Sequence, residues 1–318
     1  MRPRAHRPLP DRQAALLRRA VRLEAWTVAA MVAVSLMMYL AAGNSQAMKT
    51  AWVEDVLSLV PPLAFLAAAR FARRPPDDEY VNGRNRAFDI TFLVSAVALT
   101  GVGLALIYDG ARALLSREHP SIGGVDLAGH LVWQGWVMIA ALVVSTLPPV
   151  VLGRMKLALA RELQLKPLHT DADMNKADWM TGLAGVAGVA GIGLGFWWAD
   201  AAAALFIAGS VLHDGLGNLK GAMRDLHDAR PETVERGKPD PLAERVRDAV
   251  AALGWVERCE VRLHEEGPRV CGVLVLTPRD GDATPAHLRE AERAARGVHW
   301  RIDEINATFP GAGAGEAA

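Results

Sequence analysis

The amino-acid sequence predicts an α-helical membrane protein with six transmembrane helices, followed by a small α+β domain. Six apolar segments come first, each near the roughly 20 residues that a helix needs to cross a bilayer. Short loops join them, and alternate loops are rich in Lys and Arg. The last part of the chain instead mixes polar and apolar residues as a soluble domain does. Of all 318 residues, 51% are hydrophobic, which fits a chain with both parts.

The first element is a basic arm at residues 1–22, which lacks the small-residue cleavage site of a signal peptide. We therefore interpret it as a cytoplasmic arm that leads into a transmembrane domain at residues 23–217. The tight turn "WWAD" at 197–200 joins the last two spans. The six predicted spans lie near residues 25–42, 52–71, 88–109, 131–152, 176–198 and 199–217.

The charges in the loops predict the orientation. Lys and Arg gather in cytoplasmic loops. The arm holds seven arginines, and the loop "RFARRPPDDEYVNGRNR" after span two holds five. The loop after span four carries Arg154, Lys156, Arg161 and Lys166, whereas the opposite loops are poor in basic residues. Both termini are therefore expected on the cytoplasmic side of an inner or plasma membrane.

The soluble part begins with a charged, Pro-containing linker at residues 218–240. Residues 241–310 then pattern as helix, strand, strand, helix and strand, near 241–253, 255–264, 269–277, 285–296 and 300–309. This order predicts a ferredoxin-like module. The Gly/Ala-rich tail at 311–318 is expected to be disordered. With only two cysteines, the chain has no disulfide framework.

Composition and motifs argue against several functions. The formal net charge is zero, which argues against a nucleic-acid partner. An intramembrane aspartyl protease would need a Gly-x-Gly-Asp motif, which the sequence lacks. The soluble part contains neither a nucleophile triad nor a Gly-Lys phosphate loop.

Acidic residues inside two spans are the main functional signal. Glu54 and Asp55 lie in span two, and Asp178 lies just inside span five, after Asp171 and Asp173. Ionisable residues at bilayer depth mark ion or proton pathways by default, although hydrated helix ends can also carry them. Two charged carboxylates repel each other, and a shared cation or proton would remove that repulsion. The acids of spans two and five are thus expected to hold a cation.

Two further patterns concern the same spans. "SLVPPLAF" in span two places Pro61 and Pro62 where they free the carbonyls of Leu57 and Ser58, which either supply cation ligands or mark a simple kink. Span four repeats the dipeptide at residues 148–149 without a nearby carboxylate. In span five, glycines recur every third residue from 182 to 191, a spacing that favours close helix packing.

The chain resembles the cation diffusion facilitator family. The resemblance rests on "TDADMNKADWM" in span five, "RRPPD" and "GRNRA" after span two, "WWAD" before span six and the order of elements in the soluble part. It covers residues 23–309. The resemblance implies a homodimeric membrane protein in lipid that exports divalent metal ions in exchange for protons, with no resident cofactor.

For span five, the resemblance implies two metal ligands four residues apart, usually Asp or His. Counting back from "WWAD" places Asp178 at the second position and Met174 at the first. Because a thioether is a departure from the family pattern, Asp171, Asn175 and the freed carbonyls become candidate replacements.

For span two, the resemblance implies a second pair with the same spacing. Counting from "RRPPDD" selects Glu54 and Ser58, and a shift of one residue selects Asp55 and Leu59. Both choices stay open. The candidate metal ligands are therefore Asp178, Asp55, Glu54, Ser58, Asp171 and Asn175.

The ligand types bear on the ion. Oxygen ligands suit Mg²⁺, Mn²⁺ or Fe²⁺, whereas histidine suits Zn²⁺ and similar ions. No histidine stands at the aligned intramembrane positions, which favours the harder ions, and the candidates are Mn, Fe, Zn and Co. His213 and Asp214 are candidates for a proton relay.

The soluble module of this family often binds regulatory metal. Cys259, His264 and His287 are candidate remnants of such a site, although ordinary surface or core positions explain them as well. The alternative function is a membrane protein that senses metal or acts as a scaffold and has lost transport, because two aligned positions lack the usual ligands.

Overall fold

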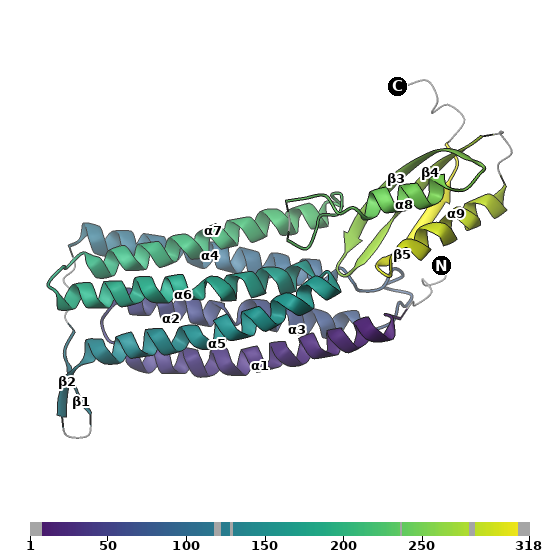
Figure 1. Cartoon of the computed structure of the whole chain (residues 1–318). Helices are drawn as coiled ribbons and strands as arrows, with labels where there is room; N and C mark the ends of the chain where they lie inside the picture. Colours follow the sequence, from purple (N-terminus) through teal and green to yellow (C-terminus); the bar gives the residue numbers. More distant parts are fainter. Residues whose placement is uncertain (1–7, 118–121, 128–129, 236, 280–283, 311–318) are drawn as a thin grey trace.

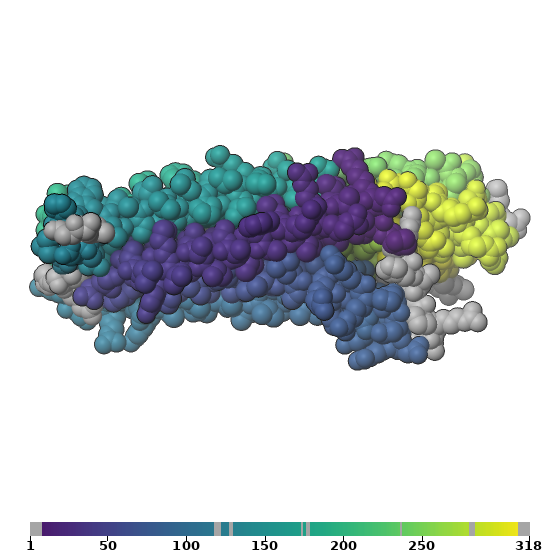
Figure 2. Space-filling model, turned by 90° about the horizontal axis from the view of Figure 1, so that it is seen from below, coloured from purple at the N-terminus to yellow at the C-terminus, as the bar shows by residue number. Residues whose placement is uncertain are grey.

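The computed structural model describes residues 8–117, 122–127, 130–235, 237–279 and 284–310; the side chains of residues 127, 173 and 176–178 lie outside this description. Within these residues, seven helices form an elongated bundle, and a small C-terminal module, residues 242–308, lies at one end of it (Figure 1). The N-terminal end of α1 lies at the same end of the bundle (Figures 1 and 2). A two-stranded hairpin lies at the opposite end (Figure 1).

The bundle is helical almost throughout. Its helices are α1 (Asp11–Ala41), α2 (Gln46–Leu57), α3 (Val60–Ala72), α4 (Ala87–Leu115), α5 (Gln134–Leu163), α6 (Lys166–Gly193) and α7 (Ala199–Leu226). Within the described residues, five segments are long and apolar enough to cross a membrane: α1, α2 with α3, α4, α5 and α7. In α6 the apolar stretch within the described residues is shorter, Trp179–Gly193. The first half of this helix is rich in polar residues.

Several helices differ in length from the predicted spans. Helix α1 begins at Asp11, so half of the predicted arm is helical, in keeping with its many strong helix formers. Helix α7 continues to Leu226, nine residues past the predicted end of span six. Helix α5 begins at Gln134 rather than at residue 131, because strands β1 (Gly124–Leu127) and β2 (His130–Trp133) pair antiparallel before it.

The predicted second span is divided into two helices. Helix α2 ends at Leu57 and α3 begins at Val60, with Pro61 and Pro62 in its first turn. Proline fits the first turn of a helix because it has no N–H to donate there. For the same reason, neither proline can pair with the last carbonyls of α2, so the chain breaks there instead of continuing as one helix.

The glycines of α6 pack closely against both neighbours, as their spacing predicted. A Cβ atom at Gly182 would lie 2.2 Å from Cγ2 of Thr146 in α5, and one at Gly191 would lie 2.3 Å from Cβ of Ala199 in α7. The glycine face thus holds α6 mainly against α5 and α7. At Gly188 a Cβ atom would also come within 3.3 Å of Cβ of Ala47, so α2 is a further neighbour.

The C-terminal module has the predicted order of elements. These are α8 (Leu242–Ala251), β3 (Val256–Glu266), β4 (Arg269–Pro278), α9 (Pro285–Val298) and β5 (Ile302–Thr308). The sheet has the order β3-β4-β5, with β3 antiparallel and β5 parallel to β4. Its own hydrophobic core includes Val246, Leu274, Ala291 and Ile305.

Candidate functional site

A small cavity lies between the break in α2–α3, the polar half of α6 and the middle of α7. Polar side chains from all three elements line it, together with a few apolar residues and the thioether of Met174. The polar lining residues are Glu54, Ser58, Asp171, Asn175, Thr181, Ser210 and Asp214. Oxygen atoms therefore dominate its polar lining.

Four of the six predicted ligands meet at this cavity. Glu54 and Ser58 come from the last turn of α2, and Asp171 and Asn175 come from α6. Residues 54 and 58, like 171 and 175, are four apart, so each pair lies on one face of its helix. The predicted span-two pair thus faces the same space as Asp171 and Asn175. In span five the predicted pair was instead Met174 and Asp178, with these two residues as replacements.

The other two predicted ligands, Asp55 and Asp178, are not among the described residues that line the cavity. Asp55 has a buried Oδ2 atom without a hydrogen-bond partner among the described residues. Its position next to Glu54 turns it about 100° around the helix, away from that face. Asp178 lies in α6, but its side chain lies outside the described part of the structure. Of the two span-two candidates, Glu54 is therefore the one whose position at the cavity fits a ligand.

Residues on both sides of the break between α2 and α3 line the cavity. The hydroxyl of Ser58 donates to the carbonyl of Glu54 over 3.0 Å, which holds this side chain at the end of α2. Pro61 lines the cavity as well. Because residues 61 and 62 have no N–H, the helix leaves the carbonyls of Leu57 and Ser58 without their usual partners. Such carbonyls are suitable ligands for a hard cation.

A buried trio of charged residues adjoins the cavity through Asp171. The trio consists of Glu24 in α1, Lys156 in α5 and Asp171 in α6, whose exposed fractions are 1%, 0% and 5%. The Lys156 ammonium lies 2.9 Å from Oε2 of Glu24 and donates to Oδ2 of Asp171. The Asn175 amide lies 3.4 Å from Oδ1 of the same aspartate. Asp171 thus connects a buried lysine to the cavity lining.

The sequence reasoning missed this trio. It counted Lys156 among the loop charges that set the orientation, and it gave Glu24 no role. The position of Glu24 and Lys156 in the sequence could have indicated them. Each lies at the edge of an apolar run, and the helix continues on both sides of it. What paired them was the packing of α1 against α5, which the chain order alone does not specify.

The predicted proton relay is divided by the structure. Asp214 lines the cavity, whereas His213 is exposed on α7. Adjacent residues of a helix point about 100° apart, so the two side chains lie on different faces of α7. Thr181 and Ser210 also line the cavity, but no sequence pattern singled them out.

Asp200 of the "WWAD" turn ties α7 to α2 at the far end of the bundle. Its carboxylate accepts hydrogen bonds from the Ser45 hydroxyl at 2.5 Å and from the backbone N–H groups of Gln46 and Ala47 at 2.5 and 3.1 Å. These groups form the N-terminus of α2, where a negative charge is stabilising. The motif thus orients the helix that carries Glu54.

Buried ion pairs connect the polar end of α6 to the C-terminal module. Lys166 donates to Glu265 of β3 and, over 3.2 Å, to Asp225 of α7. Glu265 also accepts from Arg301, which pairs with Asp240 over 2.7 Å. A chain of contacts therefore runs from the helix that carries Asp171 into the sheet.

A second link joins the end of α7 to the start of α4. Arg86 donates to Asp228 over 2.6 Å and lies 3.9 Å from Glu266 of β3. The hydrogen bond from this guanidinium holds the pKa of the Asp228 carboxyl below its usual range. Asp228 therefore stays charged well below neutral pH, and the link persists there.

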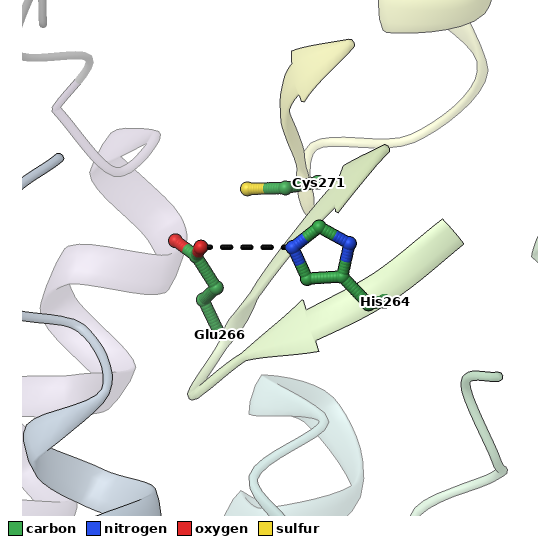
Figure 3. Close-up of side chains that lie close together, drawn as sticks. All are labelled: His264, Glu266 and Cys271. Carbon is green, nitrogen blue, oxygen red and sulfur yellow. Dashed lines mark ion pairs between the residues drawn. The ribbon is translucent and has the colours of Figure 1, made fainter. Parts of the chain in front are cut away.

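The three candidate remnants in the C-terminal module do not form one site. His287 of α9 stacks on Trp255, with ring centroids 4.7 Å apart. Cys259 and His264 lie five residues apart in β3, so they point to opposite faces of the strand. Burial raises the pKa of the Cys259 thiol. His264 instead lies beside Glu266 and Cys271 (Figure 3).

Comparison with known proteins gives a family match over the helical bundle. Residues 23–227 match the family model of the cation efflux transmembrane domain. The match begins in α1 and ends directly after α7, so it covers the whole cavity and the buried trio. No curated protein matches the chain.

Proposed function

Because the chain belongs to the cation efflux (cation diffusion facilitator) family, it is an integral membrane transporter of metal cations rather than an enzyme, and we propose that it exports divalent ions in exchange for protons. The observation that carries the proposal is the cavity between α2, α6 and α7. Four polar residues selected from the sequence line it together.

The proposed ion site consists of Glu54, Ser58, Asp171 and Asn175, with Asp178 as a further ligand from α6. The carboxylates supply charge, and the hydroxyl and amide oxygens complete the set. Asp171 is held by Lys156, so its position in the site is fixed before an ion arrives. Of the two span-two candidates, we choose Glu54 over Asp55 as the ligand, because within the described residues Glu54 lines the cavity and Asp55 does not.

The same carboxylates account for proton coupling. Charged carboxylates facing one cavity repel each other unless a cation or protons neutralise them. A divalent ion bound from the cytoplasm would neutralise them first, and protons from the other side would do so after the helices have moved to open there. One set of ligands thus serves both ions in turn.

The proposed substrate class is a hard divalent ion such as Mn²⁺ or Fe²⁺. Carboxylate, hydroxyl and amide oxygens prefer such ions to Zn²⁺. Met174 also lines the cavity, but its sulfur accepts from the Asn218 amide at 3.4 Å, which gives it a packing partner. We therefore assign Met174 no ligand role.

The proposed arrangement in the membrane has six spans. Helix α6 has 28 residues and is therefore about 42 Å long at 1.5 Å per residue, which exceeds a hydrocarbon core of about 30 Å. With α6 as a span, both termini fall on the side of the basic loops, the cytoplasm. We also propose that the chain forms a homodimer and that its C-terminal module is ferredoxin-like.

A pair of neighbouring substitutions tests the ion site. In proteoliposomes with a pH gradient, we expect Glu54→Gln to abolish Mn²⁺-dependent proton flux, because it removes a charged ligand from the cavity. The matched control is Asp55→Asn, which removes the same charge one residue later and should keep most of the flux. Flux and Mn²⁺ uptake are measured in the same vesicles.

The outcomes separate the alternatives. Full flux in Glu54→Gln together with loss in Asp55→Asn would assign the span-two site to Asp55. Mn²⁺ binding without any flux in the wild type would favour the metal-sensing or scaffolding alternative. Absence of both for every divalent ion would contradict the ion site itself.

A further inference from the structure

The turn between β3 and β4 lies against the membrane bundle. The N–H of Gly267 donates to Oδ2 of Asp89 at the start of α4 over 3.2 Å. A Cβ atom at this glycine would lie 2.7 Å from the carbonyl oxygen of Asn85, and its φ is +57°. Only glycine fits such a close approach with that backbone conformation. The hairpin is therefore held at the junction between the module and the bundle.

Next to this turn, three side chains of types that can ligate a metal share one face of the hairpin (Figure 3). His264 and Glu266 are two residues apart in β3, so they point to the same side. Cys271 of β4 is the direct cross-strand partner of His264. We call His264, Glu266 and Cys271 the junction cluster. Their ligand atoms all lie within 4.8 Å of one another.

The distances suit a tetrahedral ion. Zn–N, Zn–O and Zn–S bonds of about 2.0–2.3 Å place tetrahedral ligand atoms roughly 3.3–3.8 Å apart. Nε2 of His264 is already 3.6 Å from Oε1 of Glu266. The sulfur of Cys271 must approach by about 1 Å at most, which a small side-chain rotation provides.

We propose that the junction cluster binds a zinc-like transition metal ion, such as Zn²⁺ or Co²⁺. Nitrogen, oxygen and thiolate ligands together select ions of this borderline class rather than the hard ions proposed for the cavity. This site therefore goes beyond the proposed transport function. On binding, the Cys271 thiol releases its proton to solvent and the thiolate sulfur bonds to the ion.

The surroundings allow an ion to enter and the acid to turn toward it. The His264 side chain is 28% exposed, which opens the cluster to the cytoplasmic end of the bundle in the proposed orientation, whereas Cys271 is buried. Arg86 lies 3.9 Å from Glu266 and has a closer carboxylate partner in Asp228, at 2.6 Å. Moving Glu266 to a metal thus leaves Arg86 with a charged partner.

The chain offers a matched test because it has only two cysteines. The full-length protein is titrated with Co²⁺ in detergent, under reducing conditions. A thiolate bound to Co²⁺ gives a charge-transfer absorption that oxygen and nitrogen ligands do not. We expect this band in the wild type and in Cys259→Ser, and its loss in Cys271→Ser.

A second variant keeps the test decisive if Cys271→Ser folds poorly. His264→Ala removes a ligand and leaves both thiols, so we expect the apparent Co²⁺ affinity to fall at least tenfold. Glu54→Gln should leave the band unchanged, which separates this cluster from the transport cavity. A wild-type protein without the band, a band that survives in Cys271→Ser, or an unchanged Co²⁺ affinity in His264→Ala would overturn the proposal.

Discussion

At the scale of single residues, the buried trio places the strongest constraint on the bundle. Two carboxylates and one ammonium are almost wholly out of contact with solvent. Removing a charge from water costs several kcal/mol, and close pairing offsets that cost only while all partners are present. Lys156 therefore supplies the charge that compensates the Asp171 carboxylate beside the cavity.

This leads to a prediction for Lys156→Met. The variant leaves Glu24 and Asp171 buried without their cation, so we expect the free energy of unfolding to fall by roughly 3–5 kcal/mol. The measurement is denaturant unfolding of the purified protein in detergent.

The control is a double-mutant cycle with Glu24→Gln. If the ammonium and the Glu24 carboxylate are coupled, the double variant loses less stability than the sum of the two single variants. Strict additivity would contradict the pairing.

At the scale of elements, the two Pro-Pro dipeptides have different effects. At Pro61–Pro62 the helix is divided, and the break lies beside the cavity. At Pro148–Pro149 helix α5 continues unbroken from Gln134 to Leu163. Proline removes the same hydrogen bonds in both places, so the surrounding packing decides whether a helix bends or breaks.

The break is expected to be required for transport. Replacing Pro61 and Pro62 by alanine restores two N–H donors that can join α2 and α3 into one helix and move Ser58 out of position. We expect Mn²⁺ flux in proteoliposomes to fall on the order of tenfold, because a ligand set tolerates only about 0.5 Å of displacement. Stability should change little, since proline is well tolerated in a first turn.

The same pair of substitutions at Pro148 and Pro149 is the matched control. Helix α5 is already continuous there, and neither proline lines the cavity within the described residues. Flux should stay near the wild-type value. Equal loss in both double variants would show that the effect is not specific to the break.

At the scale of the whole molecule, α6 connects the cavity to the C-terminal module. Its polar half carries Asp171 and Asn175, and its first residue, Lys166, pairs with Glu265 of β3. Both members of this pair are buried. A movement of α6 during transport would therefore be transmitted to the β3–β4 hairpin.

We predict that Lys166→Ala loosens this connection. Without the lysine, Glu265 keeps Arg301 but loses its contact with the bundle, so amide hydrogen exchange in β3 and β4 should become faster. Exchange is measured by mass spectrometry on the full-length protein. Glu260→Gln is the control, because it breaks an exposed pair with Arg262 in the same strand. Unchanged exchange in Lys166→Ala would contradict the coupling.

Much of the fold could be predicted because it depends on local patterns. Apolar runs of sufficient length, turn residues and strand alternation act over a few residues, so the order of elements in the C-terminal module agrees with the structure. The ends of α1 and α7 could not be predicted as well. Both continue into charged sequence, where helix formation depends on packing at the junction rather than on hydropathy.

The sequence by itself determined which side chains are of ligand type and how they are spaced along each helix, because both are properties of the amino-acid order. It could not decide between Glu54 and Asp55, pair Lys156 with Glu24, or bring His264 to Cys271 instead of Cys259. Those outcomes depend on which helices and strands lie side by side and on the direction in which each face points. Only the tertiary structure fixes these relations, since they arise from packing between segments that are far apart in the chain.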